Sequence, residues 1–423
     1  MSRPTGWMSS IPPYWGKKKL KYVASLKSGD SITSDSIAES GEYPVFGGNG
    51  IRGYTSAYTH CGKYVLIGRQ GALCGNIHYA SGCFWASEHA VVVDIKGEDE
   101  VAWLGELLRS MDLNQYSQSA AQPGIAVDVI ANLEIPVPPL HEQRAIADYL
   151  DRETARLDGL VAAKERVLGL LAEKRLALIT RAVTRGLDPH APLRDPGILW
   201  LGEIPAHWTA TRLKFVAEVQ GGLTLGKNYG TATLVEYPYL RVANVQDGYL
   251  DLSEVATILV PEAEAETCLL EAGDVLMNEG GDADKLGRGC IWTGEIAPCL
   301  HQNHVFAVRP RPVRSEWLNA WTSTEVAKAF FESRAKQSTN LASISATNIK
   351  ELPIPVPPVD EQRAIVAHIA AETAKLDALR AATERTIALL KERRAALIAA
   401  AVTGRMTMHE STEDNLPGGR HEN

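Results

Sequence analysis

Two long stretches of the chain place apolar residues at alternating steps of three and four, the spacing of a single stripe along a helix. The first stretch runs from Glu142 to Thr184 and the second from Glu361 to Thr403. At a rise of 1.5 Å per residue, a helix of about 45 residues spans roughly 65 Å. The stripe residues expected to pair the helices are Leu150, Leu157, Leu171, Leu178, Ile369, Leu376, Leu390 and Leu397, with Ile146, Leu160, Val167, Ile365 and Leu379 in the same stripes.

The two helical stretches are copies of one sequence. The segment from Ile135 to Thr184 reappears without a gap from Ile354 to Thr403, with most positions identical. Each copy opens with Ile-Pro-Val-Pro-Pro, whose prolines end a strand and start the helix. Because one small domain cannot bury so long a stripe, we expect the two helices to pair as an intramolecular antiparallel coiled coil. Glu142-Gln143-Arg144 and Glu361-Gln362-Arg363 are expected to cap the helices and to hold each one to its domain.

Each helix follows a segment with a different pattern, in which short runs of Val, Ile, Tyr and Phe alternate with Gly, Asn and Asp turns. Runs such as Tyr64 to Ile67 predict strands. Patterns near Val101 to Met111 and Glu316 to Ser333 predict helices. The two segments also share their opening, since Ile11 to Trp15 matches Ile204 to Trp208.

We therefore predict a mixed α/β (α+β) fold class, with two similar globular domains separated by the long helices in a pseudo-twofold arrangement. The expected divisions are a first domain at 1–139, a helix at 140–187, a linker at 188–198, a second domain at 199–358, a helix at 359–404 and a disordered tail at 405–423.

Composition narrows the class of protein. Hydrophobic residues make up 45% of the 423 residues, enough for two or three packed domains. The segment from Met1 to Lys18 lacks the pattern of a secretory signal, and charge interrupts every long apolar stretch. We therefore expect no membrane span and a cytoplasmic location. Six cysteines in a chain of this length do not make a disulfide framework, and we expect them to be reduced.

The formal net charge of −8 argues against a nucleic-acid partner, but local clustering of charge matters more than the total. Lys17, Lys18 and Lys19 form a basic run near the start of the chain, and Asp30 is the only acidic residue among the first thirty. These lysines are predicted to contact phosphates. The alternative is a solvated lysine face without a ligand.

Three patterns suggest enzyme chemistry, and each lacks a required feature. Ile11-Pro12-Pro13-Tyr14 looks like the Asn/Asp-Pro-Pro-Tyr/Phe box of adenine methyltransferases, but Ile11 has no oxygen to accept from the target amino group. Gly221 to Asn228 approximates a phosphate loop, but Asn228 replaces the hydroxyl residue that binds magnesium. The spacing of Cys74 and Cys83 recurs in Cys290 and Cys299 without tight Cys-x-x-Cys pairs, so small buried residues on equivalent strands are expected. No catalytic or metal-binding residue is predicted.

The duplicated strings resemble those of a known family, the specificity subunits of type I restriction-modification systems. The resemblance covers nearly the full length and rests on Pro-Val-Pro-Pro, Glu-Gln-Arg-Ala-Ile, Leu-Asp, Glu-Lys-Arg or Glu-Arg-Arg, and Ala-Val-Thr. It implies that each globular unit is a target recognition domain for one half of a bipartite site in double-stranded DNA. It further implies that the paired helices fix the gap between the half-sites and dock two methyltransferase subunits. The chain itself would be non-catalytic and bind no cofactor, with S-adenosylmethionine, ATP and Mg on the methyltransferase and restriction (motor) subunits.

Base-reading residues are expected where Gly-rich turns let the backbone approach a duplex and where Arg, Lys, Asn or Gln side chains face it. The candidates are Asn49, Arg52, Arg69 and Gln70 in the first domain and Lys227, Arg241, Asn244, Lys285 and Arg288 in the second. Solvated turns without a ligand are the alternative for each.

Two other functions stay open. The chain could be a coiled-coil scaffold whose globular ends bind protein, which DNA-binding measurements would distinguish. A stand-alone modifying enzyme is the second rival, and the missing oxygen at Ile11 disfavours it.

Overall fold

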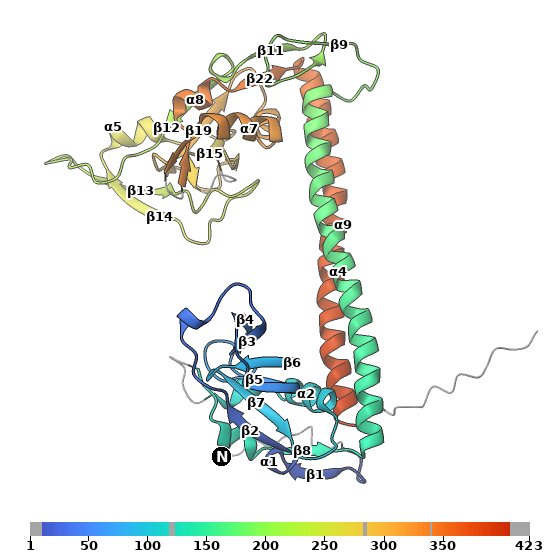
Figure 1. Ribbon diagram of the computed structural model, residues 1–423. Helices are drawn as coiled ribbons and strands as arrows, with labels where there is room; N and C mark the ends of the chain where they lie inside the picture. The colour runs from blue at the N-terminus through green and yellow to red at the C-terminus, as the bar shows by residue number, and fades with distance from the viewer. Residues whose placement is uncertain (1–10, 118–122, 282–285, 339–340, 407–423) are drawn as a thin grey trace, which may run out of the picture. The chain divides into compact units, whose positions relative to one another are not determined.

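The computed structural model describes residues 11–117, 123–281, 286–338 and 341–406 (Figure 1). Its contacts divide the chain into two compact units. Unit 1 comprises residues 1–165 and 385–423, and unit 2 comprises residues 166–384. Each unit therefore contains one α/β domain and a part of both long helices. The tail predicted for 405–423 lies outside the described residues beyond position 406.

The domain of unit 1 is built on a six-stranded sheet with the strand order β2-β7-β5-β6-β3-β4. Consecutive residues Val65, Leu66 and Ile67 of β5 are all buried, as expected for a central strand covered on both faces. Helix α2 packs on β5 and β6 through buried residues that include Trp103 and Leu107. The elements are β1 (Gly16–Lys19), α1 (Leu20–Val23), β2 (Ala24–Ser28), η2 (Ser34–Ser36), β3 (Tyr43–Gly47), β4 (Gly50–Thr55), β5 (His60–Gly68), β6 (Ile77–Ala86), β7 (Ala90–Ile95), α2 (Val101–Ser110), η3 (Leu113–Tyr116), α3 (Val127–Ala131), β8 (Glu134–Val137) and the start of α4 (Leu140–Arg185).

The domain of unit 2 has a four-stranded sheet in the order β12-β19-β15-β17, with smaller sheets β14-β13-β18 and β16-β21-β20 beside it. The helix predicted for Glu316 to Ser333 is two helices, because the Thr324 hydroxyl accepts from the backbone N–H of Ala327 and starts a new helix there. The elements are β9 (Leu193–Arg194), β10 (Ile204–Pro205), β11 (Thr209–Arg212), η4 (Leu213–Phe215), β12 (Ala217–Gly221), β13 (Val235–Leu240), β14 (Ala256–Val260), α5 (Glu262–Ala265), η5 (Glu266–Cys268), β15 (Val275–Asn278), β16 (Gly280–Gly281), β17 (Gly289–Ile291), β18 (Leu300–His301), β19 (Val305–Pro310), α6 (Ser315–Thr322), α7 (Glu325–Arg334), β20 (Lys336–Ser338), β21 (Leu341–Ser343), α8 (Ala346–Lys350), β22 (Pro353–Val356) and α9 (Val359–Val402).

Within each unit, α4 and α9 run side by side in opposite directions (Figure 1). In unit 1, Arg394 Nε lies 2.9 Å from Asp158 Oδ1 and Lys391 Nζ lies 3.5 Å from Glu165 Oε1. Residue numbers therefore rise along α4 as they fall along α9. In unit 2, Arg175 Nη1 lies 2.6 Å from Asp377 Oδ1. These exposed pairs show that the two helices are antiparallel, and they add little stability.

The apolar stripe confirms most of the predicted pairing residues. Leu150, Leu157, Leu171, Ile369 and Leu376 are buried. Leu178 and Leu397 pack against the cores of units 2 and 1, respectively, and Leu390 is half-buried.

Two of the expected stripe residues were wrong. Leu160 is 41% exposed and Leu379 is 50% exposed, and each lies three residues after a buried leucine of its helix. Ile387 is buried on α9 instead. An uninterrupted α-helix has 3.6 residues per turn, so a strict heptad stripe drifts away from the contact face.

A buried glutamine attaches α4 to the domain of unit 1. The Gln143 side chain is 1% exposed. Its Nε2 donates to Asp99 Oδ1 at 2.7 Å and to the Pro138 carbonyl at 2.9 Å, and its Oε1 accepts from the backbone N–H of Glu100 at 2.7 Å. Since Glu100 is the N-cap residue of α2, one side chain joins the starts of two helices.

Gln362 attaches α9 to the domain of unit 2 in the same way. It is also 1% exposed, donates from Nε2 to the Pro357 carbonyl at 2.9 Å and accepts at Oε1 from the backbone N–H of Arg314 at 3.0 Å. Arg314 is the N-cap residue of α6. The prediction that this motif holds each helix to its domain is confirmed for the glutamines.

The glutamates of the motif contribute a second attachment. Glu142 Oε2 accepts from Trp15 Nε1 at 3.0 Å, and Glu361 Oε2 lies 2.8 Å from His207 Nε2. Trp15 and His207 belong to the shared opening segments of the two domains, and so the Pro-Pro-Tyr-Trp turn anchors a helix rather than forming a catalytic box. Arg144 is exposed and has no part in these contacts.

The predicted linker at 188–198 is partly folded. β9 pairs with β10, and the Arg194 guanidinium donates to the carbonyl oxygens of Ala206 at 3.1 Å and Trp208 at 2.6 Å. The segment is therefore a part of unit 2. None of the described helices is both long enough and apolar enough to span a membrane.

The expectation that all cysteines are reduced was wrong for one pair. Cys61 and Cys83 form a disulfide, because the register of β5 and β6 sets these residues directly opposite each other with their Cα atoms 4.0 Å apart. Cys83 is thus not the small buried residue that was expected. Cys74, Cys290 and Cys299 are buried free thiols, and burial raises the pKa of Cys290 and of Cys299 to about 12.

Candidate nucleic-acid interface

Two Gly-rich turns of unit 1 meet at a surface hollow of about 530 Å³. One is the β3–β4 turn and the other follows β5. The turns touch through their glycines: a Cβ on Gly68 would lie 2.1 Å from the carbonyl oxygen of Gly48. Gly50 and Gly71 both have a φ of +92°, a backbone conformation that residues with a Cβ atom rarely adopt. The glycines therefore allow the close approach that creates the hollow.

Three of the four predicted base-reading residues of the first domain line this hollow. They are Asn49, Arg52 and Gln70, all exposed. Asn49 Oδ1 accepts from Asn76 Nδ2 at 3.2 Å, which orients the amide. Arg69 does not line the hollow; its Nη1 donates to Ser28 Oγ at 3.1 Å.

Sequence reasoning missed the apolar part of the hollow. Ile51 and Leu73 are both exposed there, and His89 completes the lining. Exposed aliphatic side chains beside Asn, Gln and Arg suit the thymine methyl group and the polar base edges of a major groove. An apolar residue inside a Gly-rich polar turn, as in Gly50-Ile51-Arg52, was the available signal.

The predicted lysines lie elsewhere in unit 1. Lys17, Lys18 and Lys19 are exposed along β1, which pairs with β8. β1 leads into α1 and the first residue of β2, which pairs with the end of β7, whereas His89 of the hollow precedes the start of β7. The structure therefore does not bring these lysines together with the base-reading candidates.

The candidates of the second domain are not gathered at one place. Lys227 Nζ lies 2.5 Å from Glu264 Oε1, and this hydrogen bond raises the pKa of Lys227. Arg288 donates from Nη2 to Gln246 and lines a hollow beside α4 and α9 in unit 2. Arg241 is half-buried, and Lys285 lies outside the described residues.

The prediction for Asn244 is corrected. Its side chain is 3% exposed. Its Oδ1 accepts from the backbone N–H of Arg241 at 2.9 Å, and its Nδ2 donates to the carbonyl oxygens of Asp251 at 2.9 Å and Glu254 at 2.8 Å. Because this side chain is buried and makes three hydrogen bonds to the backbone, Asn244 shapes a loop and does not face a base.

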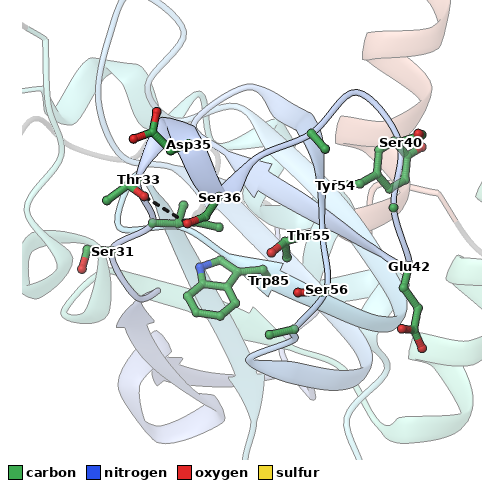
Figure 2. Close-up of a pocket in the computed structure, with 14 residues that line it drawn as sticks. Ser31, Thr33, Asp35, Ser36, Ser40, Glu42, Tyr54, Thr55, Ser56 and Trp85 are labelled. Atoms are coloured by element: carbon green, nitrogen blue, oxygen red, sulfur yellow. Dashed lines mark hydrogen bonds between the residues drawn. The ribbon is translucent and has the colours of Figure 1, made fainter.

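A second hollow of unit 1, of about 740 Å³, lies beside β4 and the segment before β3 (Figure 2). Its polar lining consists mainly of hydroxyl groups, with Thr33 Oγ1 3.0 Å from Ser36 Oγ and the Trp85 ring on one wall. Asp35 and Glu42 make it acidic, which does not suit phosphate. No histidine or cysteine lines it, and within the described ranges no cluster of three His, Cys, Asp or Glu residues is placed to hold a metal ion.

These features define a class of protein with two α/β domains, each anchored by a buried glutamine to an antiparallel pair of long helices. The chain belongs to the family described as type I restriction modification DNA specificity domain, which matches residues 12–166 and 205–387. The two matched segments each contain one α/β domain and the first part of the helix that follows it.

Relatives and solved structures agree with this assignment. The type I restriction enzyme EcoprrI specificity subunit of Escherichia coli is 44% identical over 142 residues, which are 32% of this chain and 35% of that protein. The EcoKI specificity subunit of Escherichia coli K12 is 25% identical over 291 residues, 67% of this chain and 60% of that protein. The matches thus span between about a third and three fifths of these relatives' lengths.

Two solved structures share the fold. A chain from a structure of type I R-M complex assembly and conformational transition has a TM-score of 0.69 at 18% identity, covering 94% of this chain and 99% of its own length. The HsdS subunit from Thermoanaerobacter tengcongensis has a TM-score of 0.50 at 18% identity, covering 94% and 98%.

Proposed function

We propose that this chain is the DNA-specificity subunit of a type I restriction-modification complex and reads a bipartite target in double-stranded DNA. The observation that supports this best is that the two domains are attached to the long helices in the same way but differ in the turns that carry the base-reading candidates. Both domains are anchored to long helices by the same glutamine, whereas the Gly-walled hollow of unit 1 has no gathered counterpart among the candidates described in unit 2. Two domains with different candidate surfaces, attached in the same way, suit two half-sites of different sequence.

In this proposal the hollow of unit 1 contacts base edges. Asn49 and Gln70 match the donor and acceptor pattern of adenine, and Arg52 matches that of guanine. Lys17, Lys18 and Lys19 add sequence-independent contacts to phosphates. Catalysis, with S-adenosylmethionine, ATP and Mg, belongs to the partner subunits.

The long helices dock the methyltransferase subunits in this proposal. Each helix carries two exposed leucines outside the pairing stripe, Leu160 and Leu170 on α4 and Leu379 and Leu389 on α9. These pairs are equivalent positions of the duplicated sequence. Exposed leucines on an otherwise polar helix face provide an apolar contact for a partner.

DNA binding by the full chain tests the proposal. Duplex DNA carrying the target should be retained at moderate salt, alone or with the methyltransferase subunit. Gln70→Ala should weaken retention of target DNA by about tenfold, because one bidentate base contact contributes about 1–3 kcal/mol, and should leave binding to random DNA unchanged.

The control is Gln115→Ala, which removes the same side chain at an exposed position outside the hollow. If duplex DNA is retained in neither condition, the scaffold function is favoured. Methyl transfer from labelled cofactor by the isolated chain would instead establish the stand-alone enzyme.

Exchange of residues 1–139 for the equivalent domain of a relative should alter one half-site and leave the other unchanged. The exchange keeps β1 and β8 together, since both lie inside the exchanged segment. Sequencing of methylated positions in host DNA measures the result. A change in both half-sites would contradict independent reading by the two domains.

A further inference from the structure

The two units share an exposed feature that the proposed reading of DNA does not use. In unit 1, Lys21 Nζ lies 5.4 Å from the centroid of the Tyr22 ring, and in unit 2, Lys214 Nζ lies 5.2 Å from that of Phe215. Tyr22 is 67% exposed and Phe215 is 69% exposed. Large aromatic side chains this exposed, each covered on one side only by a lysine, are available to a partner.

The polar surroundings of the two rings are also equivalent. Lys21 Nζ donates to Asn132 Oδ1 at 2.9 Å, and Lys214 Nζ donates to Glu351 Oε1 at 2.7 Å. Asn132 and Glu351 occupy the same position before β8 and β22.

A further basic residue follows the neighbouring strand in each unit. The backbone N–H of Lys96, after β7, donates to the Val23 carbonyl at 2.9 Å, and that of Arg311, after β19, donates to the Val216 carbonyl at 2.7 Å. We call Lys21, Tyr22 and Lys96 the unit 1 patch, and Lys214, Phe215 and Arg311 the unit 2 patch.

The unit 1 patch faces a different part of the surface from the base-reading hollow. It lies at the start of β2, where Ala24 pairs with Ile95 of β7. The hollow lies beyond the other end of this strand pair, where His89 precedes β7. The unit 2 patch likewise lies at the start of β12, which is an edge strand of its sheet. None of the residues assigned to reading bases in unit 1 belongs to the unit 1 patch.

Chemistry favours a protein partner over nucleic acid. The bases of a duplex are stacked inside it, so an exposed ring gains little from its backbone. In unit 2, Glu351 accepts from Lys214 and lies 2.8 Å from Arg212 Nη1, and hydrogen bonding by Lys214 lowers the pKa of this carboxyl. This ion pair holds the Lys214 ammonium in place beside the Phe215 ring. Large aromatic side chains are instead among the residues that dominate protein interfaces.

We infer that the two patches are equivalent docking sites, each of which binds one copy of the same protein through a recess for the ring with carboxylates around it. Duplication of the site implies two copies of the partner for each chain. In the complex proposed above, the protein bound in two copies is the methyltransferase subunit, so the identity of the partner rests on the proposed function, and the patches add to its contacts with the long helices.

Native mass spectrometry and titration of the full chain with the methyltransferase subunit test this inference. The unit 1 variant is Lys21→Glu with Tyr22→Ala, and the unit 2 variant is Lys214→Glu with Phe215→Ala. Each should weaken one of two binding events by about tenfold or more, and the combined variant should weaken both. The conservative controls Tyr22→Phe and Phe215→Tyr place in each unit the ring found in the other, and should bind two copies as the unchanged chain does.

The outcomes separate the inference from the proposed function. If the unchanged chain binds two copies and the combined variant binds them equally well, the patches are not the docking sites, although the proposed function stands. If the unchanged chain binds none, the proposed function fails, and the inference fails with it. Normal methyltransferase binding with weaker retention of random DNA would assign the patches to phosphate contacts. Unchanged thermal unfolding of the variants, expected for exposed side chains, shows that the effects are local.

Discussion

Leu157→Asp should lower the free energy of unfolding by about 4 kcal/mol or more, because it places an unpaired carboxylate in the buried contact between α4 and α9. Leu157 is 1% exposed in unit 1. Leu376→Asp should act in the same way in unit 2, where Leu376 is 9% exposed, with a smaller loss. Urea unfolding followed by circular dichroism measures both, and loss of the helix pair should abolish methylation at every site.

Each buried leucine has a matched control three residues further along its helix. Leu160→Asp and Leu379→Asp make the same chemical change at positions that are 41% and 50% exposed. These variants should stay within about 0.5 kcal/mol of the unchanged chain. Equal losses for Leu157→Asp and Leu160→Asp would show that the stripe does not hold the helices together.

Gln143→Ala should cost about 3 kcal/mol, since it leaves the Pro138 carbonyl and the Glu100 N–H buried without their partner and opens a cavity. Gln362→Ala should cost less, about 2 kcal/mol, because Gln362 makes two of the observed hydrogen bonds where Gln143 makes three. Thermal and urea unfolding of both variants give the comparison.

The neighbouring arginines provide the control for the glutamines. Arg144 and Arg363 belong to the same motif but are exposed, and Arg363 Nη1 lies 3.2 Å from Asp360 Oδ1 of its own helix turn. Their replacement by alanine should change stability by no more than about 0.5 kcal/mol. A loss for Arg144→Ala as large as that for Gln143→Ala would refute the proposed anchoring.

The sequence predicted the helices well because their signals are local. Three prolines precede each start, and the repeated Glu-Gln-Arg string marked the residues that attach the helix. The helix expected at 140–187 runs over Leu140–Arg185, and that expected at 359–404 runs over Val359–Val402. The duplication of the helical segment predicted that the two helices pair, since only a helix of equal length covers so long an apolar stripe.

Features that depend on tertiary register were beyond the sequence. The Cys61–Cys83 bond follows from the alignment of β5 with β6, which no local pattern specifies. Burial of Asn244 follows from a loop that folds back on Asp251 and Glu254. By contrast, Asn49 and Gln70 were found from residue type and glycine context alone, since the glycines that flank them are what brings their turns together.

The division of the helices between the units has a consequence for biosynthesis. Unit 2 is one continuous segment, residues 166–384, whereas unit 1 needs residues 385–402 of α9 to cover the apolar face that includes Ile146 and Leu150. A ribosome adds residues in order at about 5–20 per second, so the first domain emerges well before its last structural piece. For some tens of seconds the nascent chain therefore exposes that apolar surface. A chaperone that binds it would raise the yield of folded protein.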